Sequence, residues 1–326
     1  MNKKSVAFLF FLASLLPGAS FAAPYGEFLI KTSVQLSFSK PSKNKNNSLK
    51  YYGGPVISHA KVFVVFWGPW VDSQIQSNIG PFYQNILDSG YMDRLAQYST
   101  NIPAMDGRPG TGQTIGRGSF IGEVVISPQN QESNLTDGMI QKELEFQISS
   151  GVLPTPDADT LYMIYLPVGV SVSLPDSSRS CWGKKAFGGY HEGFKSSAGT
   201  SIFYGVIPAC SSNFETITAV SSHETIEAIT DPFPTLGYNP SYPQAWNSAA
   251  GFEAADLCEG IAPPSFVNGT SVHSAVEPWW DNAARACSKG PWSQKSSARI
   301  LLGDDSRALS VIRQARGLAP NLWDGH

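Results

Sequence analysis

The segment 212–232 constrains the fold most, because its sequence is that of a buried helix carrying ionisable side chains. Ser212 followed by Glu215 has the spacing of a capping box, which predicts where the helix starts. Pro232 disfavours helical backbone at the residue before it, so we expect the helix to end near Thr230 and Asp231 to lie just beyond it. Its apolar residues are scattered around the helix axis, which is typical of a helix buried on all sides.

Three ionisable residues, His223, Glu224 and Glu227, interrupt this apolar surface. A buried carboxylate without a partner costs several kcal/mol or stays protonated, so a compensating group is expected. Positions four apart share one helix face at about 5–6 Å, which lets His223 and Glu227 bind one cation. The alternative is a histidine that forms a cap or a hydrogen bond in the core.

The same spacing occurs in the His-Glu-x-x-His helix of zinc peptidases, in which the Glu is the base for the metal-bound water. Here Glu224 occupies the position of that base, and Glu227 replaces the second histidine. The extra negative charge would weaken the Lewis acidity of zinc or favour a harder cation.

A second acidic pair, Glu253 and Asp256, follows in the sequence with a spacing of three, which places both on one side of a turn. Cys258 is placed to pin this turn by a disulfide to Cys287. In zinc peptidases the third ligand comes from such a downstream Glu or Asp. An acidic pair on the surface is the alternative.

The N-terminus predicts export. Residues 1–4 are basic, residues 6–16 are apolar but too few to span a bilayer, and residues 20–22 form a small-x-small cleavage site. We therefore expect a signal peptide at 1–22 and a secreted protein, extracellular or periplasmic; a retained membrane anchor is the alternative. Charged residues make up only 15%, with 30 Gly and 23 Pro, which is typical of loop-rich extracellular proteins.

All four cysteines, Cys181, Cys210, Cys258 and Cys287, follow the predicted signal peptide. An even number in an oxidising compartment predicts two disulfides, for which three pairings exist. We favour Cys181 with Cys210 and Cys258 with Cys287, because these are nearest neighbours along the chain. A structural zinc site with four cysteines is disfavoured, because no Cys-x-x-Cys spacing is present.

Strands and helices alternate ahead of the buried helix. We predict strands at 60–67, 119–127, 160–167 and 200–208, and helical segments at 72–98 and 136–150. This order is similar to that of the N-terminal half of zincin metallopeptidases. We therefore expect an α/β (α+β) fold, in which a zincin-like mixed sheet has flanking helices and a buried active-site helix, followed by a loop-rich C-terminal subdomain.

After the predicted signal peptide, the predicted domain organisation has three parts. The polar, basic residues 23–50 are expected to form a flexible leader. Residues 51–290 are expected to form one domain, with a sheet and helix half at 51–232 and a loop-rich half at 233–290. Residues 291–326, which include a possible short helix at 297–316, form a C-terminal tail.

Five ordered blocks carry a resemblance to a known family. They are Tyr-Gly-Gly-Pro at 52–55, Gly-Gly-Tyr-His at 188–191, Ser-His-Glu-Thr-Ile-Glu-Ala-Ile-Thr-Asp-Pro at 222–232, Glu-Ala-Ala-Asp-Leu-Cys at 253–258 and Glu-Pro-Trp-Trp-Asp-Asn at 277–282. Together they resemble the phosphate-induced, EXORDIUM-like protein family over roughly residues 50–290, in particular its bacterial branch. Plant members mostly lack the His-Glu pair and are associated with cell-wall growth, so the resemblance implies that the fold does not require a metal.

His191 is a further candidate, since it follows two glycines that permit close backbone approach. In zincins the strand beside the active helix lines the substrate cleft, so His191 is predicted to bind the metal or to polarise the scissile carbonyl. A hydrogen-bonded loop histidine is the alternative. His59 and His273 have no such context and are expected to be structural.

The leading hypothesis is a secreted zinc metalloendopeptidase that acts on a protein or peptide substrate. His223 and Glu227 would bind zinc, Asp256 or Glu253 would complete the site, and Glu224 would deprotonate water. Asp231 and His191 would orient ligands or face the substrate. We expect a monomer, and a net charge of -3 gives no indication of a nucleic-acid or membrane partner.

The alternative comes from another class of protein. It is a secreted binding or cell-surface protein in which the same carboxylates hold calcium, or no metal at all.

Overall fold

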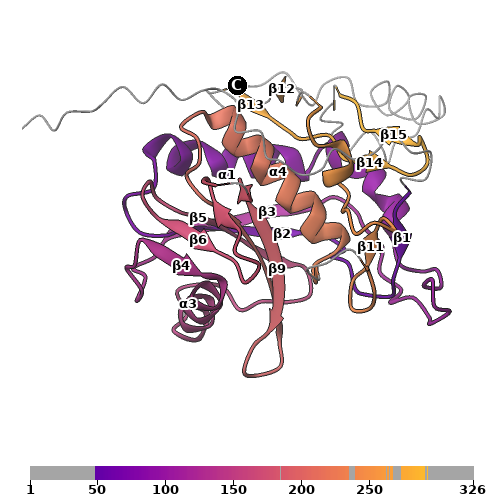
Figure 1. The fold of residues 1–326 in the computed structure, drawn as a ribbon, viewed down its shortest axis with the longest axis horizontal. Coiled ribbons are helices and arrows are strands. Elements are labelled where there is room, and N and C mark those ends of the chain that lie inside the picture. The colour runs from indigo at the N-terminus through magenta and orange to yellow at the C-terminus, as the bar shows by residue number, and fades with distance from the viewer. Residues whose placement is uncertain are drawn as a thin grey trace, which may run out of the picture. The chain divides into compact units, whose positions relative to one another are not determined.

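The computed structural model describes residues 48–183, 185–234, 239–261, 263, 265–266, 273–290 and 292. The predicted signal peptide 1–22, most of the predicted leader 23–50 and nearly all of the predicted tail 291–326 lie outside these residues. The described residues form a mixed α/β fold built on a five-stranded sheet of order β3–β2–β5–β10–β9 (Figure 1). Its strands are β2 (Lys61–Phe66), β3 (Ser119–Val125), β5 (Thr160–Tyr165), β9 (Tyr190–Lys195) and β10 (Ser201–Ile207).

The sheet is parallel except at one edge. β2 pairs in parallel with β3 and with β5, and β10 pairs in parallel with β5. β9 lies at the edge and runs antiparallel to β10. The four strands predicted from apolar runs are confirmed within a few residues, whereas β9 was not predicted.

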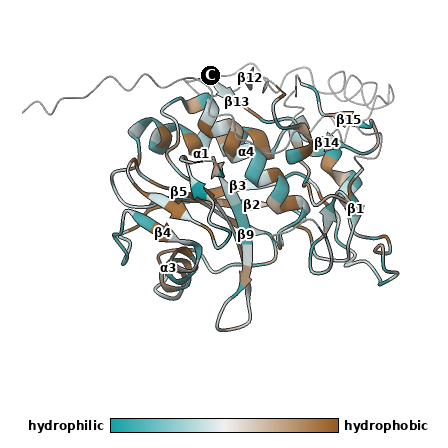
Figure 2. Ribbon diagram, in the orientation of Figure 1, coloured by the Kyte–Doolittle hydropathy of each residue, from teal (hydrophilic) through white to brown (hydrophobic). Residues whose placement is uncertain are grey.

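Helices cover both faces of this sheet (Figure 1). The helices α1 (Ser73–Leu87) and α4 (Phe214–Thr230) share one hydrophobic cluster with one face of the sheet, and α3 (Asp137–Ser149) shares a second cluster with the other. Because both faces are covered, all six residues of β5 are buried. Figure 2 shows hydrophobic residues along the central strands, and hydrophilic residues intermixed with hydrophobic ones along α4.

The predicted helical segment 72–98 is interrupted. α1 ends at Leu87, and a short helix α2 (Gly90–Asp93) and a 3-10 helix η1 (Arg94–Tyr98) follow. A new helix begins after α1 because the side chain of Ser89 accepts a hydrogen bond from the backbone N–H of Tyr91 and so caps α2. The predicted helix 136–150 is confirmed as α3.

Short elements complete the described fold. A four-stranded sheet has the order β4 (Asn134–Thr136), β6 (Ser171–Ser173), β7 (Arg179–Ser180) and β8 (Ala186–Phe187). Beyond α4 the described chain consists of loops, a 3-10 helix η2 (Asp256–Cys258), and two-residue strands: β11 (Trp246–Asn247), paired with β1 (Lys50–Tyr51), β12 (Ser265–Phe266), paired with β13 (Ser274–Ala275), and β14 (Trp280–Asp281), paired with β15 (Ala286–Cys287).

Two disulfides connect Cys181 with Cys210 and Cys258 with Cys287. The nearest-neighbour pairing is therefore confirmed, and all four cysteines are engaged. Disulfides persist in oxidising compartments, which agrees with the predicted export. Within the part of the chain that the structure describes, no helix combines the length and the apolar character needed to cross a bilayer.

Candidate metal centre

The helix α4 positions three of the predicted residues. It begins one residue later than the capping box predicts, because Asn213 is the N-cap and its side-chain oxygen accepts the N–H of Glu215 at 2.8 Å. The prediction of a capping box at Ser212 is therefore wrong. The C-terminal end is as predicted, with Thr230 the last helical residue and Asp231 just beyond it.

His223 faces acidic groups on both sides of its ring. Its Nε2 lies 3.1 Å from Oε2 of Glu227 and 3.6 Å from Oδ1 of Asp256. Its Nδ1 lies 3.8 Å from Oε2 of Glu277. His223, Glu227 and Asp256 thus meet as predicted, and Glu227 is only 4% exposed. Glu277 was not singled out from the sequence, although it lies in the last of the five family-like blocks.

His191 lies in a second acidic environment. Its Nδ1 is 3.4 Å from Oε2 of Glu224 and 3.9 Å from Oε2 of Glu227. Its Nε2 is 3.1 Å from the backbone oxygen of Asp231 and 3.4 Å from Oε1 of Glu253. The edge strand β9 holds this imidazole against α4, so His191 lies in a strand, and the alternative of a loop histidine is wrong.

The two downstream acids are divided between the two imidazoles. Asp256 lies beside His223, whereas Glu253 lies beside His191, so Asp256 is the third group at His223. Oε1 of Glu253 is buried and accepts no well-formed hydrogen bond from the described residues, although Nε2 of His191 lies 3.4 Å from it.

Backbone N–H groups hold the 253–258 turn against α4. Oε1 of Glu227 accepts hydrogen bonds from the backbone N–H of Ala255 at 3.1 Å and of Asp256 at 2.9 Å. The disulfide from Cys258, the last residue of η2, to Cys287 closes the other end of the turn. These contacts direct Oε2 of Glu227 toward the imidazoles.

Asp231 contacts the cluster through its backbone carbonyl. Its carboxylate accepts hydrogen bonds from the N–H of Ala245 at 2.8 Å and from the side-chain amide of Asn247. Burial raises the pKa of this carboxyl to about 7. Asp231 therefore fixes the segment after α4, while its carbonyl oxygen faces His191.

The cluster carries more negative than positive charge. Its ion pairs among the described residues involve only the two imidazoles and never a Lys or Arg; the acids concerned are Glu224, Glu227, Glu253, Asp256 and Glu277. Burial raises the pKa of Glu253 well above its ordinary value. Burial by itself lowers the pKa of His191 and of His223, but the surrounding carboxylates raise both well above the ordinary value.

These side chains fit a divalent cation. Two groups have ligand atoms that all lie within 4.8 Å of one another: His223, Glu227 and Asp256, and His191, Glu224 and Glu227. Imidazole nitrogen combined with carboxylate oxygen suits zinc and other borderline divalent ions. The acidic charge of the cluster, which its ion pairs with the two imidazoles leave in excess, is consistent with a bound cation.

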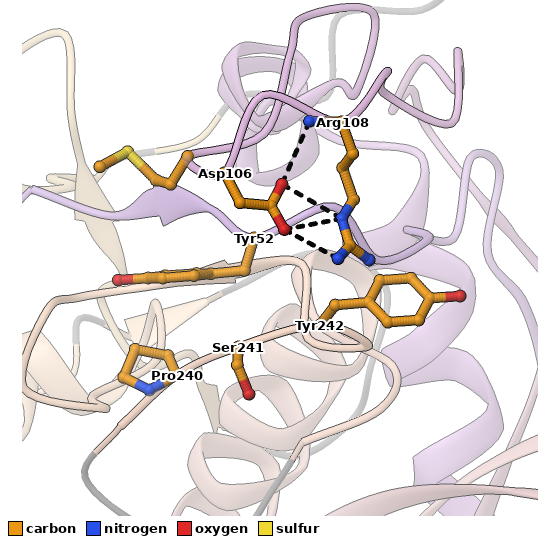
Figure 3. A pocket seen from close by; sticks show the side chains of 7 residues that line it. Tyr52, Asp106, Arg108, Pro240, Ser241 and Tyr242 are labelled. Carbon is orange, nitrogen blue, oxygen red and sulfur yellow. Dashed lines mark hydrogen bonds and ion pairs between the residues drawn. The ribbon is translucent and has the colours of Figure 1, made fainter.

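A separate pocket of about 420 Å³ lies elsewhere on the fold (Figure 3). Its lining includes Tyr52, Asp106, Arg108 and Tyr242, with the guanidinium of Arg108 stacked 4.1 Å from the centre of the Tyr242 ring. None of the residues of the acidic cluster lines this pocket.

Comparison with known proteins finds no matching family model, no matching curated protein and no matching solved structure. The resemblance to the EXORDIUM-like family therefore stays a prediction.

The two disulfides allow a matched test of how the turn supports the site. Both bonds close loops with a sequence separation of 29, so removing either is expected to lower the free energy of unfolding by a similar amount, about 3.6 kcal/mol. Only the Cys258→Ser/Cys287→Ser variant is expected to weaken zinc binding as well, because Cys258 ends the turn that carries Asp256. Denaturant unfolding and zinc titration of both double variants check this; equal zinc affinities would contradict it.

Proposed function

We propose that this chain is a secreted, metal-dependent hydrolase, most closely a zinc metallopeptidase of zincin-like organisation. The observation that carries the proposal is the convergence of Nε2 of His223, Oε2 of Glu227 and Oδ1 of Asp256 beside a buried helix. The order of elements supports it, since α4 follows the sheet strands and packs against both β10 and the antiparallel edge strand β9. We also propose the bacterial branch of the EXORDIUM-like family as its family, on the five sequence blocks.

A divalent cation held by His223, Glu227 and Asp256 would lower the pKa of a bound water and polarise a substrate carbonyl. Glu224, which is 6% exposed, supplies the base that accepts a proton from the attacking water. Its Oε1 lies beside Gly189, where an added Cβ would come within 2.8 Å of that oxygen. Because Gly189 has no side chain, there is room for the Glu224 carboxylate at this position.

His191 orients the base. When both ring nitrogens carry a hydrogen, Nδ1–H donates to Oε2 of Glu224 at 3.4 Å, which leaves Oε1 of Glu224 to take the proton. On the other side of the ring, Nε2 donates a hydrogen bond to the backbone oxygen of Asp231. Two backbone N–H groups bind Oε1 of Glu227 and restrict this side chain, so its other oxygen, the ligand oxygen, is held in place.

Hydrolysis of an unstructured protein such as casein tests the proposal. Purified protein loaded with zinc is expected to cleave it, to lose the activity when a chelator removes the zinc, and to regain it when zinc is restored. Cleavage that is insensitive to the chelator, or a folded, zinc-loaded protein that cleaves neither casein nor a peptide library, would contradict the proposal.

A second candidate function is favoured by the excess of oxygen donors in the cluster. Five carboxylates face only two imidazoles, and calcium prefers oxygen ligands. A secreted binding protein with a structural calcium ion would hold calcium and no zinc in elemental analysis. A hydrolase of the proposed kind holds zinc.

A further inference from the structure

His191 is surrounded by acceptors on both sides of its ring. The backbone oxygen of Asp231, 3.1 Å from Nε2, can only accept a hydrogen bond, so Nε2 carries the hydrogen. In the neutral ring Nδ1 then presents a lone pair toward Oε2 of Glu224 and Oε2 of Glu227, at 3.4 Å and 3.9 Å. Three electron-rich atoms therefore converge on one point, where only a proton or a cation is stabilising.

We propose that this point is a second metal position, in which Nδ1 of His191, Oε2 of Glu224 and Oε2 of Glu227 bind a second divalent transition-metal ion. The inference rests on the proposed function, because Glu227 would be shared with the cation at His223 and Asp256. The hydrolase would then use a pair of cations bridged by one carboxylate. Among the described residues, each of the two ligand groups contains one imidazole, and Glu227 belongs to both.

The hydrogen bond from Nε2 of His191 to the backbone oxygen of Asp231 favours Nδ1 as a metal ligand. Histidines that bind metals commonly donate their other ring N–H to a backbone carbonyl or a carboxylate, which fixes the tautomer and the ring orientation. Nε2 of His191 has both kinds of partner, the carbonyl of Asp231 at 3.1 Å and Oε1 of Glu253 at 3.4 Å. The ring is thus oriented with Nδ1 toward the two glutamates of α4.

The charge of the cluster favours two cations over one. Five carboxylates face the two imidazoles, and the described residues provide no Lys or Arg to pair with them. With five ionised carboxylates and neutral imidazoles, one divalent cation leaves three negative charges uncompensated, whereas two cations leave one. Uncompensated buried charge is strongly unfavourable.

The geometry of Glu227 suits a bridging role. Its Oε1 is engaged by the N–H groups of Ala255 and Asp256, while Oε2 faces both imidazoles, Nε2 of His223 at 3.1 Å and Nδ1 of His191 at 3.9 Å. Two-metal sites recur in hydrolases, with the ions about 3.5–4 Å apart, and one oxygen that faces both imidazoles is placed to contact both ions. Glu224 would bind by Oε2 alone, so its Oε1 stays available to accept a proton.

Metal stoichiometry tests the inference without using activity. Protein stripped with a chelator and dialysed against zinc is expected to carry about two zinc ions per chain in native mass spectrometry, and His191→Ala and His223→Ala about one each. His273→Ala, which replaces an exposed histidine outside the cluster, is expected to keep both. If the wild type carried one zinc ion and His191→Ala retained it, the second position would be overturned and the proposed function would stand. If none of the proteins bound zinc, both the second position and the proposed function would be overturned.

A measurement on the wild type covers the case in which His191→Ala does not fold. Protein loaded with manganese is expected to give the exchange-coupled electron paramagnetic resonance signal of two ions bridged by a carboxylate. The six-line signal of isolated manganese, at every ratio of manganese to protein, would overturn the paired site.

Discussion

Replacing Glu224 by Gln is expected to lower the rate of hydrolysis by about 10²- to 10⁴-fold, the contribution typical of a general base. The amide has nearly the same shape as the carboxyl, so the helix and its packing are retained. It cannot accept a proton, however, and it no longer contributes a negative charge at Nδ1 of His191. Zinc is expected to remain at His223, Glu227 and Asp256. Hydrolysis rates and zinc content of the same preparation check both expectations.

Glu215→Gln on the same helix is the matched control. Glu215 lies in the first turn of α4 and belongs to neither ligand group. The Glu215→Gln variant is expected to hydrolyse the substrate and to bind zinc like the wild type. Full hydrolysis by Glu224→Gln would exclude Glu224 as the base, even if zinc binding were intact.

Replacing Glu227 by Gln is expected to remove zinc from both positions, because this side chain belongs to both ligand groups. Gln can still accept the N–H groups of Ala255 and Asp256 through its oxygen, but its NH₂ group then points to the imidazoles in place of the bridging oxygen. The variant also loses zinc-dependent stabilisation, which amounts to about 2.7 kcal/mol for one site when free zinc is 100 times Kd. Thermal unfolding with and without zinc checks this.

The control for this variant is Glu277→Gln. Oε2 of Glu277 lies 3.8 Å from Nδ1 of His223, on the side of the ring away from Glu227 and Asp256. The Glu277→Gln substitution is expected to weaken zinc binding and not to abolish it. If the Tm of Glu227→Gln still rose with zinc as much as that of the wild type, Glu227 would not be a ligand.

Local signals in the sequence predicted the elements that carry the site. Apolar runs located the four strands β2, β3, β5 and β10, and Pro232 located the end of α4. The spacing of four between His223 and Glu227 predicted their contact, because helix geometry alone brings such residues together. Of the three possible disulfide pairings, the favoured one between nearest neighbours is confirmed.

The strand β9 was missed because its sequence is unfavourable for a strand. Tyr190–Lys195 contains two charged residues and Gly193, and glycine in a strand interior weakens the pattern. The structure gives the reason for the glycine: a Cβ there would come within 2.2 Å of the backbone oxygen of Pro232. The close approach of β9 to the end of α4, which brings His191 into the cluster, is a long-range contact that local patterns do not contain.

The same limit applies to the downstream acids. The spacing of Glu253 and Asp256 predicted that they share a turn, but not that each faces a different imidazole. That division depends on how the turn is fixed to Glu227 by backbone N–H groups. The second ligand group is therefore visible only in the assembled fold.

The central claim is that this buried acidic cluster holds divalent cations. The most direct test is anomalous X-ray diffraction at the zinc absorption edge from crystals of the wild-type protein equilibrated with zinc. The account predicts a strong anomalous peak bounded by His223, Glu227 and Asp256. A cluster without any anomalous peak at saturating zinc, with these three side chains in the same positions, would contradict it.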